Sequence, residues 1–236
     1  MRRSVSIIIP AYNEERRLPA TLERIRNYLC AVPWEFEIVV VDDGSRDATR
    51  EIARKAGARV LANPGNRGKG YSVRHGMLEA KADWALLTDA DLSAPIQDLE
   101  KLWSAAANTG AAVAFGSRAL DRRLIGVRQP VFRDFSGRFF NLVMRLVTGL
   151  PFRDTQCGFK LFEARAAKEI FSRQQLDGFG FDVEVLFIAQ RLAYRSIEVP
   201  VRWDNVEGTK VSLLLGGKAY LDLLTVRANG ARGLYK

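Results

Sequence analysis

Histidine and cysteine are scarce in this chain of 236 residues, and their scarcity excludes several kinds of chemistry. The one histidine, His75, lies in a predicted helix, which argues against a catalytic triad built on histidine. The two cysteines, Cys30 and Cys157, lie far apart and form no CxxC pair. A disulfide framework or a zinc site is therefore not expected, and a reducing, cytosolic setting is the default.

Long apolar runs and common nucleotide-binding signatures are also missing. No stretch reaches the roughly 18 apolar residues that a membrane-spanning helix needs. The N-terminal MRRSVSIIIP has an apolar part too short for a signal-peptide core, so it indicates a first strand. The sequence contains neither GxxxxGK[ST] nor a GxGxxG directly after that strand, which argues against a P-loop NTPase and a dinucleotide-dependent dehydrogenase.

Basic residues are in excess, with a formal net charge of +9 and a pI near 9.8. Between Arg118 and Lys160, nine Lys or Arg residues stand against three acidic ones. Such an excess favours an anionic partner. Few aromatic residues alternate with the basic ones, and no zinc-finger or RNA-recognition signature appears. Contact with phosphates or with a membrane surface is therefore favoured over nucleic-acid binding.

The first half of the chain alternates predicted strands and helices. Short β-branched runs predict strands, and Asn13 is expected to cap the first helix after them. This alternation is typical of a parallel, doubly wound α/β sheet with right-handed crossovers. The predicted strands of this half are 4–9, 36–41, 58–62 and 84–88.

The second half is less regular, but no Gly/Ser-rich linker separates it from the first. We therefore expect one domain over residues 1–211, with a nucleotide half at 1–92, an acceptor half at 93–211, and a helical segment at 212–236. Helices are predicted at 96–108, 131–149, 164–172 and 182–194, and strands near 111–115, 158–162 and 197–201.

Polar residues follow three predicted strands, in the segments PAYNE (10–14), DDGS (42–45) and DAD (89–91). Each pattern alone is typical of an ordinary turn or a solvated strand end. Because the carboxyl ends of parallel strands share one edge of a sheet, their recurrence there indicates a ligand site. Two aspartates one residue apart suit Mg²⁺ or Mn²⁺, which bridges carboxylates to substrate phosphates. The glycine-rich NRGKG (66–70) could bring backbone amides and Lys69 to the same ligand.

Seven segments together carry a family resemblance. They are SIIIPAYNEE, IVVVDDGSRDAT, NRGKGYSVRHGM, LLTDADLSAP, FGSR, DTQCGFKLF and GFGFDVEVLF. Through them the sequence, from about residue 4 to 211, resembles the inverting GT-A glycosyltransferases of the family-two group, and within it the polyprenyl-phosphate (dolichyl-phosphate) sugar synthases. This resemblance implies a GT-A fold, with a Rossmann-like, mostly parallel sheet flanked by helices and an acceptor-binding C-terminal half.

The resemblance also implies roles for individual residues. A first group would surround the base and ribose of a sugar nucleotide, and a loop would close that pocket: Pro10, Tyr12, Glu14, Val41, Asp42 and Asp43, with Asn66, Gly68 and Lys69. Asp89 and Asp91 match the metal-binding pair, and Ala90 between them would contact the substrate. Ser93, which stands where mannosyl relatives often carry Gln, is the further candidate metal residue. Basic and hydroxyl residues would hold the acceptor's phosphate or the donor's diphosphate: Arg118, Arg133 and Ser136 for the first, Arg202 and Lys210 for the second. Asp91, Arg118 and Arg133 are the expected catalytic residues.

A phosphate acceptor explains the lack of a histidine base, since it is already anionic at neutral pH and needs orientation more than deprotonation. If the acceptor is a hydroxyl, Asp182 and Glu184 are candidate bases. The alternative for both is capping and ion pairing at a helix start.

The segments TQCGFKLF and VRWDNVEGTK are more similar to the UDP-glucose branch than to the GDP-mannose branch. The expected reaction is metal-dependent, inverting transfer of glucose from UDP-glucose to a polyprenyl phosphate. The alternatives are a GDP-mannose-dependent synthase, a hydroxyl-directed or processive glycosyltransferase, and a non-catalytic sugar-nucleotide-binding protein. Processive glycosyltransferases usually carry a QxxRW motif, which this sequence lacks.

A lipid acceptor implies a peripheral position at the cytoplasmic face of a membrane. The segment 131–149 mixes aromatic and aliphatic residues with arginines, as an interfacial amphipathic helix does. It could equally be a core helix of the acceptor half. For the segment 212–236, the alternatives are a surface anchor, a core helix and a dimer contact.

Overall fold

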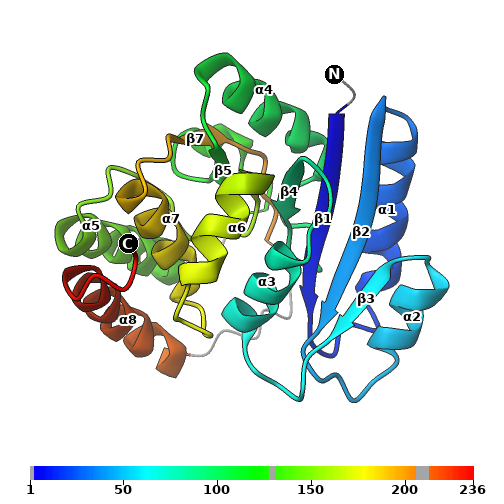
Figure 1. Cartoon of the computed structure of the whole chain (residues 1–236), viewed down its shortest axis with the longest axis horizontal. Helices are drawn as coiled ribbons and strands as arrows, with labels where there is room; N and C mark the ends of the chain where they lie inside the picture. The colour runs from blue at the N-terminus through cyan, green and yellow to red at the C-terminus, as the bar shows by residue number, and fades with distance from the viewer. Residues whose placement is uncertain (1–2, 128–130, 206–212) are drawn as a thin grey trace.

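The computed structural model describes residues 3–127, 131–205 and 213–236, leaving aside the side chains of 131–136, 138 and 213–217 (Figure 1). A seven-stranded sheet, in the order β3-β2-β1-β4-β6-β5-β7, runs through the domain. Its strands are β1 (Arg3–Ala11), β2 (Trp34–Asp42), β3 (Arg59–Ala62), β4 (Trp84–Leu87), β5 (Val113–Ser117), β6 (Lys160–Glu163) and β7 (Ser196–Pro200).

The mostly parallel sheet is confirmed, but one strand departs from the doubly wound pattern. β6 pairs antiparallel with both β4 and β5, with Lys160 opposite Leu87. The first residue of β6 therefore lies at the carboxyl end of β4, and the loop before β6 arrives at that same edge. Strand–helix alternation did not predict this reversal, because it assumes a crossover helix before every strand.

Helices cover both faces of the sheet (Figure 1). Alternate strand residues point to opposite faces, so Ile8 and Val41 belong to one core while Ile7 and Val40 belong to the other. The helices are α1 (Leu18–Cys30), α2 (Thr49–Lys55), α3 (Lys69–Leu78), α4 (Leu99–Thr109), α5 (Val131–Thr148), α6 (Ala164–Arg173), α7 (Phe181–Arg191) and α8 (Leu213–Ala231), with short 3₁₀ turns η1 (Ile96–Asp98) and η2 (Arg122–Leu124).

Helix α3 packs very close to the sheet at Gly76. A Cβ at this position would lie 2.4 Å from Ile8 Cγ2 and 2.8 Å from Val41 Cγ2, both in the core. The contact fixes the distance between α3 and the strands whose ends carry polar residues. The start of α3, at Lys69, is thereby set against the carboxyl edge of the sheet.

Gly76→Ala should lower the free energy of unfolding by about 1–3 kcal/mol, because the added methyl group overpacks the core. Gly137→Ala is the matched control, since among the described residues its added Cβ would meet no atom within 4 Å. That helical substitution should instead stabilise the protein by up to about 1 kcal/mol. Urea denaturation of both variants measures the difference, and equal effects would contradict the close packing of α3.

Candidate active site

Three polar segments meet at the carboxyl edge of the sheet, as the sequence predicts. The backbone N–H of Asp43 donates to Ala11 O at 2.9 Å, and that of Thr88 donates to Ile8 O at 3.0 Å. The segments that follow β1, β2 and β4 are therefore neighbours. The reversed strand β6 adds a fourth segment, which contains Cys157 and Gly158.

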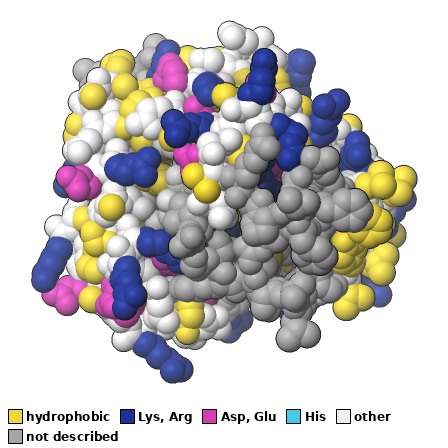
Figure 2. All heavy atoms as spheres, turned by 180° about the vertical axis from the view of Figure 1, so that it is seen from behind, with side chains coloured by type: hydrophobic (Ala, Val, Ile, Leu, Met, Phe, Trp, Pro, Cys, Tyr) yellow, Lys and Arg dark blue, Asp and Glu magenta, His cyan; other side chains and the backbone are white. Residues whose placement is uncertain are grey.

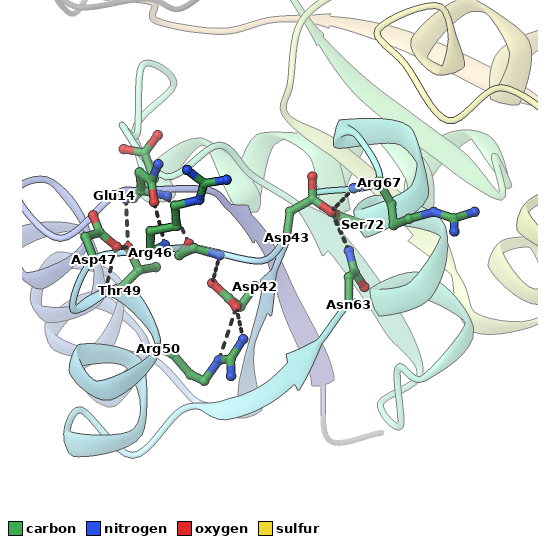
Figure 3. Close-up of polar contacts among 12 residues, drawn as sticks. Glu14, Asp42, Asp43, Arg46, Asp47, Thr49, Arg50, Asn63, Arg67 and Ser72 are labelled. Carbon is green, nitrogen blue, oxygen red and sulfur yellow. Dashed lines mark hydrogen bonds and ion pairs between the residues drawn. The ribbon is translucent and has the colours of Figure 1, made fainter. Parts of the chain in front are cut away.

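The segment after β1 is fastened to the segment after β2 (Figure 3). The N–H of Asn13 donates to Ser45 Oγ at 2.9 Å, the N–H of Arg46 donates to Asn13 Oδ1 at 2.9 Å, and the N–H of Glu14 donates to Thr49 Oγ1 at 2.7 Å. Asn13 has a left-handed φ of 53°, and α1 begins only at Leu18. The prediction that Asn13 caps this helix is wrong, because its side chain binds the neighbouring loop instead.

The predicted nucleotide residues of β1 and β2 lie along this edge with different exposures. Pro10, Tyr12 and Glu14 are half-buried, and Glu14 accepts from Arg17 Nε at 2.8 Å. Val41 is fully buried in the core, so a contact between it and a ligand would come from its backbone. Beside them is an open depression of about 590 Å³, lined by Asn13, Glu14, Glu15, Arg16, Arg17, Arg46 and Asp47.

The two aspartates of DDGS bind protein groups. Asp42 is fully buried and accepts a hydrogen bond from Arg50 Nη2 at 2.6 Å. Asp43 accepts from the N–H groups of Arg67 and Gly68, each at 2.9 Å, and from Asn63 Nδ2 at 2.8 Å (Figure 3). Asp43 thereby fixes the NRGKG loop, in which Asn66 is exposed.

Lys69, the first residue of α3, reaches the metal-binding pair suggested by the sequence. Its Nζ lies 2.6 Å from Asp89 Oδ1. Burial lowers the pKa of Lys69, but the nearby carboxylates of Asp89, Asp182 and Asp91 raise it above its ordinary value on balance. Lys69 is thus a permanent cation at this edge.

Gly158 makes room for the carboxylate of Asp89. A Cβ on Gly158 would lie 2.2 Å from Asp89 Oδ2, so no larger residue fits without displacing it. No sequence pattern points to a role for this glycine alone, because its importance depends on the antiparallel strand that brings it to β4.

Asp91 and Ser93 form a local turn. Asp91 Oδ1 accepts from the N–H of Ser93 at 3.0 Å and from its Oγ at 2.9 Å. Ser93 therefore orients Asp91. Between the aspartates, Ala90 is buried, and its carbonyl accepts from Thr21 Oγ1 of α1 at 2.7 Å.

The donor set fits a hard divalent cation. No cluster of three or more His, Cys, Asp or Glu side chains suited to a metal occurs within the ranges described. Two carboxylates whose remaining partners are substrate phosphates are the usual protein share of an Mg²⁺ or Mn²⁺ site. Asp89 and Asp91, with the hydroxyl of Ser93 beside them, are the residues that would hold it.

Arg118 is held rigidly by a buried aspartate that the sequence did not single out. Its Nε and Nη2 donate to the two oxygens of Asp154 at 2.7 and 2.8 Å, a bidentate pair. Burial raises the pKa of Asp154, but Arg118 lowers it below its ordinary value on balance. The guanidinium lies 5.5 Å from the ring of Trp203, and Trp203 lines a small crevice with Asp89, Ser93, Cys157 and Gly158.

The other predicted basic residues are only partly described. Arg133 and Ser136 belong to α5, but their side chains lie outside the description, as does all of Lys210. Arg202 is exposed: its Nε donates to Asp204 Oδ2 at 3.1 Å, and its N–H donates to Asp98 Oδ2 at 2.7 Å. The placement of these residues against a phosphate stays a prediction.

The two candidate bases of α7 are engaged in structural contacts. Asp182 pairs with the fully buried Lys160, whose Nζ also donates to Cys157 O at 2.6 Å. Glu184 is fully buried and accepts three hydrogen bonds, from the N–H groups of Gln175 and Leu176 and from the hydroxyl of Tyr235. These contacts match the structural alternative, in which both carboxylates form ion pairs and hydrogen bonds, rather than the role of a base.

Solved structures show the same fold. Glucosyl-3-phosphoglycerate synthase from Mycobacterium tuberculosis, in complex with Mn²⁺, UDP-glucose and phosphoglyceric acid, superposes with a TM-score of 0.70 over 96% of this chain and 80% of that chain. The two sequences are 19% identical, so the likeness concerns the fold. A complex of the same enzyme with UDP also gives a TM-score of 0.70, at 20% identity.

Sequence comparisons show the family. In an alignment 258 positions long, gaps included, the chain is 36% identical to a dolichyl-phosphate beta-glucosyltransferase of Mus musculus, covering 99% of this chain and 78% of that protein. It is 38% identical to a dolichyl-phosphate beta-glucosyltransferase of Drosophila melanogaster, covering 88% and 69% respectively. A family model described as Glycosyl transferase family 2 matches residues 6–171. The chain therefore belongs to glycosyl transferase family 2 and is a glycosyltransferase with a GT-A fold.

Proposed function

We propose that this glycosyltransferase transfers glucose from UDP-glucose to a dolichyl or other polyprenyl phosphate, with inversion and with Mg²⁺ or Mn²⁺. One observation carries the proposal: the Asp89 carboxylate and Trp203, over which Arg118 lies, share one crevice. A diphosphate leaving group and a phosphate acceptor need this pairing of a metal-binding edge with a fixed cation. The glucosyltransferase relatives support the sugar and the lipid acceptor, and the Mn²⁺–UDP-glucose complex of a structural neighbour supports the donor and metal.

In this proposal, one group of residues binds the donor's diphosphate and another binds the acceptor's phosphate. The segments after β1 and β2 bind the nucleotide, and Asp89 and Asp91 are the residues that would hold the cation, which would supply charge neutralisation for the leaving diphosphate. Lys69 orients Asp89 and adds positive charge at the same edge. Arg118, kept in place by Asp154, orients the acceptor phosphate. The bond from the anomeric carbon to the diphosphate oxygen breaks as the acceptor oxygen bonds to that carbon from the opposite side.

The acceptor phosphate needs no base in this arrangement. Its attacking oxygen is already anionic at neutral pH, so rate enhancement comes from orientation and charge compensation. The engagement of Asp182 by Lys160 and of Glu184 by three donors supports this choice over a hydroxyl acceptor.

We place the enzyme at the surface of a membrane, through an apolar face of α5 and α8. None of the helices in the described ranges combines the length and apolarity that crossing a bilayer requires. These two helices pack together, and they expose large apolar side chains at one edge of the molecule (Figure 2). The exposed set, called the α5–α8 face, comprises Phe139, Leu142, Leu146, Leu221 and Leu224.

The chemistry around the α5–α8 face matches an anionic lipid surface. Leu146 is 77% exposed, whereas Phe140 and Met144 on the opposite side of α5 are buried in the core. Exposed Arg145 and Lys218 accompany the apolar residues. Basic and apolar side chains on one face are typical of interfacial helices. In this proposal, α5 is therefore a core helix on one side and an interfacial helix on the other.

The substitution Asp91→Asn tests the reaction. Asn keeps an oxygen that can accept from Ser93, so the fold should persist, but the loss of a carboxylate should lower turnover at least about 100-fold. The measurement is product analysis with UDP-glucose, dolichyl phosphate and Mn²⁺, with GDP-mannose as the competing donor. Asp83→Asn, just before β4 and thus at the opposite edge of the sheet, is the control. Undiminished activity of Asp91→Asn would sink the metal assignment, and mannosyl product alone would overturn the choice of glucose.

The substitution Arg133→Ala tests the acceptor side. If Arg133 contacts the lipid phosphate, KM for that substrate should rise roughly tenfold more than KM for UDP-glucose, since one charged contact is lost. Steady-state kinetics with each substrate varied in turn measure the split. Arg191→Ala, an exposed arginine of α7, should change neither value. Equal increases for both substrates would move Arg133 away from the acceptor phosphate.

The double variant Leu146→Ser, Leu224→Ser tests the membrane surface. Both side chains are exposed, so the fold should be unaffected, but flotation with anionic phospholipid vesicles at low salt should be largely lost. Leu78→Ser, an exposed leucine at the end of α3, is the control. Unchanged flotation would refute the proposal. If the double variant instead converts a dimer to a monomer in sedimentation, the α5–α8 face binds a second copy.

A further inference from the structure

A short loop between α6 and α7 lies directly on the start of α3. We call residues 174–178 the bracing loop. A Cβ on Gly70 would lie 2.5 Å from Leu176 O, and a Cβ on Gly68 would lie 2.5 Å from Asp177 O. Glycines flank Lys69 on both sides because the backbone of the bracing loop occupies the space that side chains would need.

Hydrogen bonds join the bracing loop to α3. The N–H of Tyr71, in the first turn of α3, donates to Asp177 O at 3.2 Å. Gln174 Nε2 donates to Gly70 O at 2.9 Å, and Arg74 Nη1 donates to Gln174 O at 2.9 Å. Helix α3 has no side-chain cap, so a carbonyl of the bracing loop satisfies one of its first N–H groups. The loop and the first turn of α3 therefore form one unit.

Glu184 of α7 holds the bracing loop from its other side. Its Oε1 accepts from the N–H of Gln175 and its Oε2 from the N–H of Leu176, both at 2.9 Å. Glu184 has no exposed surface. A buried carboxylate is stable only while its oxygens are hydrogen-bonded, so every donor to it is important.

The remaining donor to Glu184 is Tyr235, which follows α8. The Tyr235 hydroxyl donates to Glu184 Oε1 at 2.7 Å and accepts from Asn229 Nδ2 at 3.2 Å. Its ring is 1% exposed and packs against Phe187 at a centroid distance of 6.0 Å. Burial raises the pKa of Glu184 above its ordinary value on balance, although the Tyr235 hydroxyl and the two N–H groups lower it in part.

We propose that Tyr235 and Glu184 are positioning residues for Lys69: through the bracing loop they fix the Lys69 ammonium against Asp89. The chain of contacts runs from the Tyr235 hydroxyl to Glu184, from Glu184 to the N–H groups of 175 and 176, and from the loop to the glycines around Lys69. This inference rests on the proposed function, since it takes Asp89 as part of the donor and metal site.

The consequence is specific to the donor side. If Glu184 loses a donor, its carboxylate can turn away or take up a proton, and the bracing loop loses part of its support. Lys69 then spends less time against Asp89, and the metal–diphosphate site is less well formed before the donor arrives. The acceptor arginine, Arg118, is held separately by Asp154 and should not respond.

The substitution Tyr235→Phe tests the proposal, because it removes one hydroxyl and keeps the buried ring. We expect KM for UDP-glucose and the Mn²⁺ concentration for half-maximal activity to rise roughly tenfold, with KM for dolichyl phosphate unchanged. Amide hydrogen exchange in 66–71 and 175–178 should speed up at least about threefold. Tyr194→Phe is the matched control, since that hydroxyl pairs with Glu169 of α6 and should leave all these quantities unchanged.

The outcomes separate this proposal from the proposed function. Unchanged KM for UDP-glucose and unchanged exchange in Tyr235→Phe, with an active wild type, overturn the positioning role. A lower melting temperature with no change in either quantity assigns Tyr235 to stability alone and also overturns it. If the wild type transfers no glucose to dolichyl phosphate, the proposed function fails. Exchange rates and calorimetric binding of UDP with Mn²⁺ to both proteins then decide the positioning role by themselves.

Discussion

Charge pairing at the carboxyl edge of the sheet is the interaction on which the site depends. Carboxylates gather there in a protein of net charge +9, and the buried ones each have a cation or N–H groups bound to them. An unpaired buried charge would cost several kcal/mol, so this pairing is a condition of folding. The same pairs hold Lys69 and Arg118 in place before any substrate arrives. The pairs with a buried carboxylate are Asp42 with Arg50, Asp154 with Arg118, and Asp182 with Lys160, and the half-buried Asp89 pairs with Lys69.

The antiparallel strand β6 completes this edge. Parallel strands bring only the segments that follow them to their carboxyl ends, and here these are the segments to which the proposed function assigns the donor. By running the opposite way, β6 brings the segment that precedes it, with Asp154 and Gly158, to the same edge. Asp154 then fixes Arg118, and Gly158 leaves space for Asp89. One strand reversal thus brings the residues that hold Arg118 and make room for Asp89 to the edge formed by the parallel strands.

The sequence predicted the strands, most helices and the meeting of three polar strand ends, because these follow from local periodicity and from the geometry of parallel sheets. It did not predict the partners of those residues. Asp154, Trp203 and Tyr235 act through contacts distant in sequence, for which no local pattern exists. Asn13 shows the opposite failure: a good local helix cap took a tertiary partner, the N–H of Arg46, instead.

The contacts of Asp182 and Glu184 bear on whether the acceptor is a hydroxyl or a phosphate. A hydroxyl acceptor needs a base with a lone pair directed at it, whereas here Lys160 pairs with Asp182 through Oδ1 and three donors bind Glu184. Freeing Asp182 would leave the buried Lys160 without a carboxylate partner, and freeing Glu184 would leave the N–H groups of the bracing loop unsatisfied in the interior. Either change would cost stability. An acceptor that is already an anion avoids this conflict. In the proposed function, the site therefore uses its carboxylates for the cation and for structure, and it binds the acceptor through arginine.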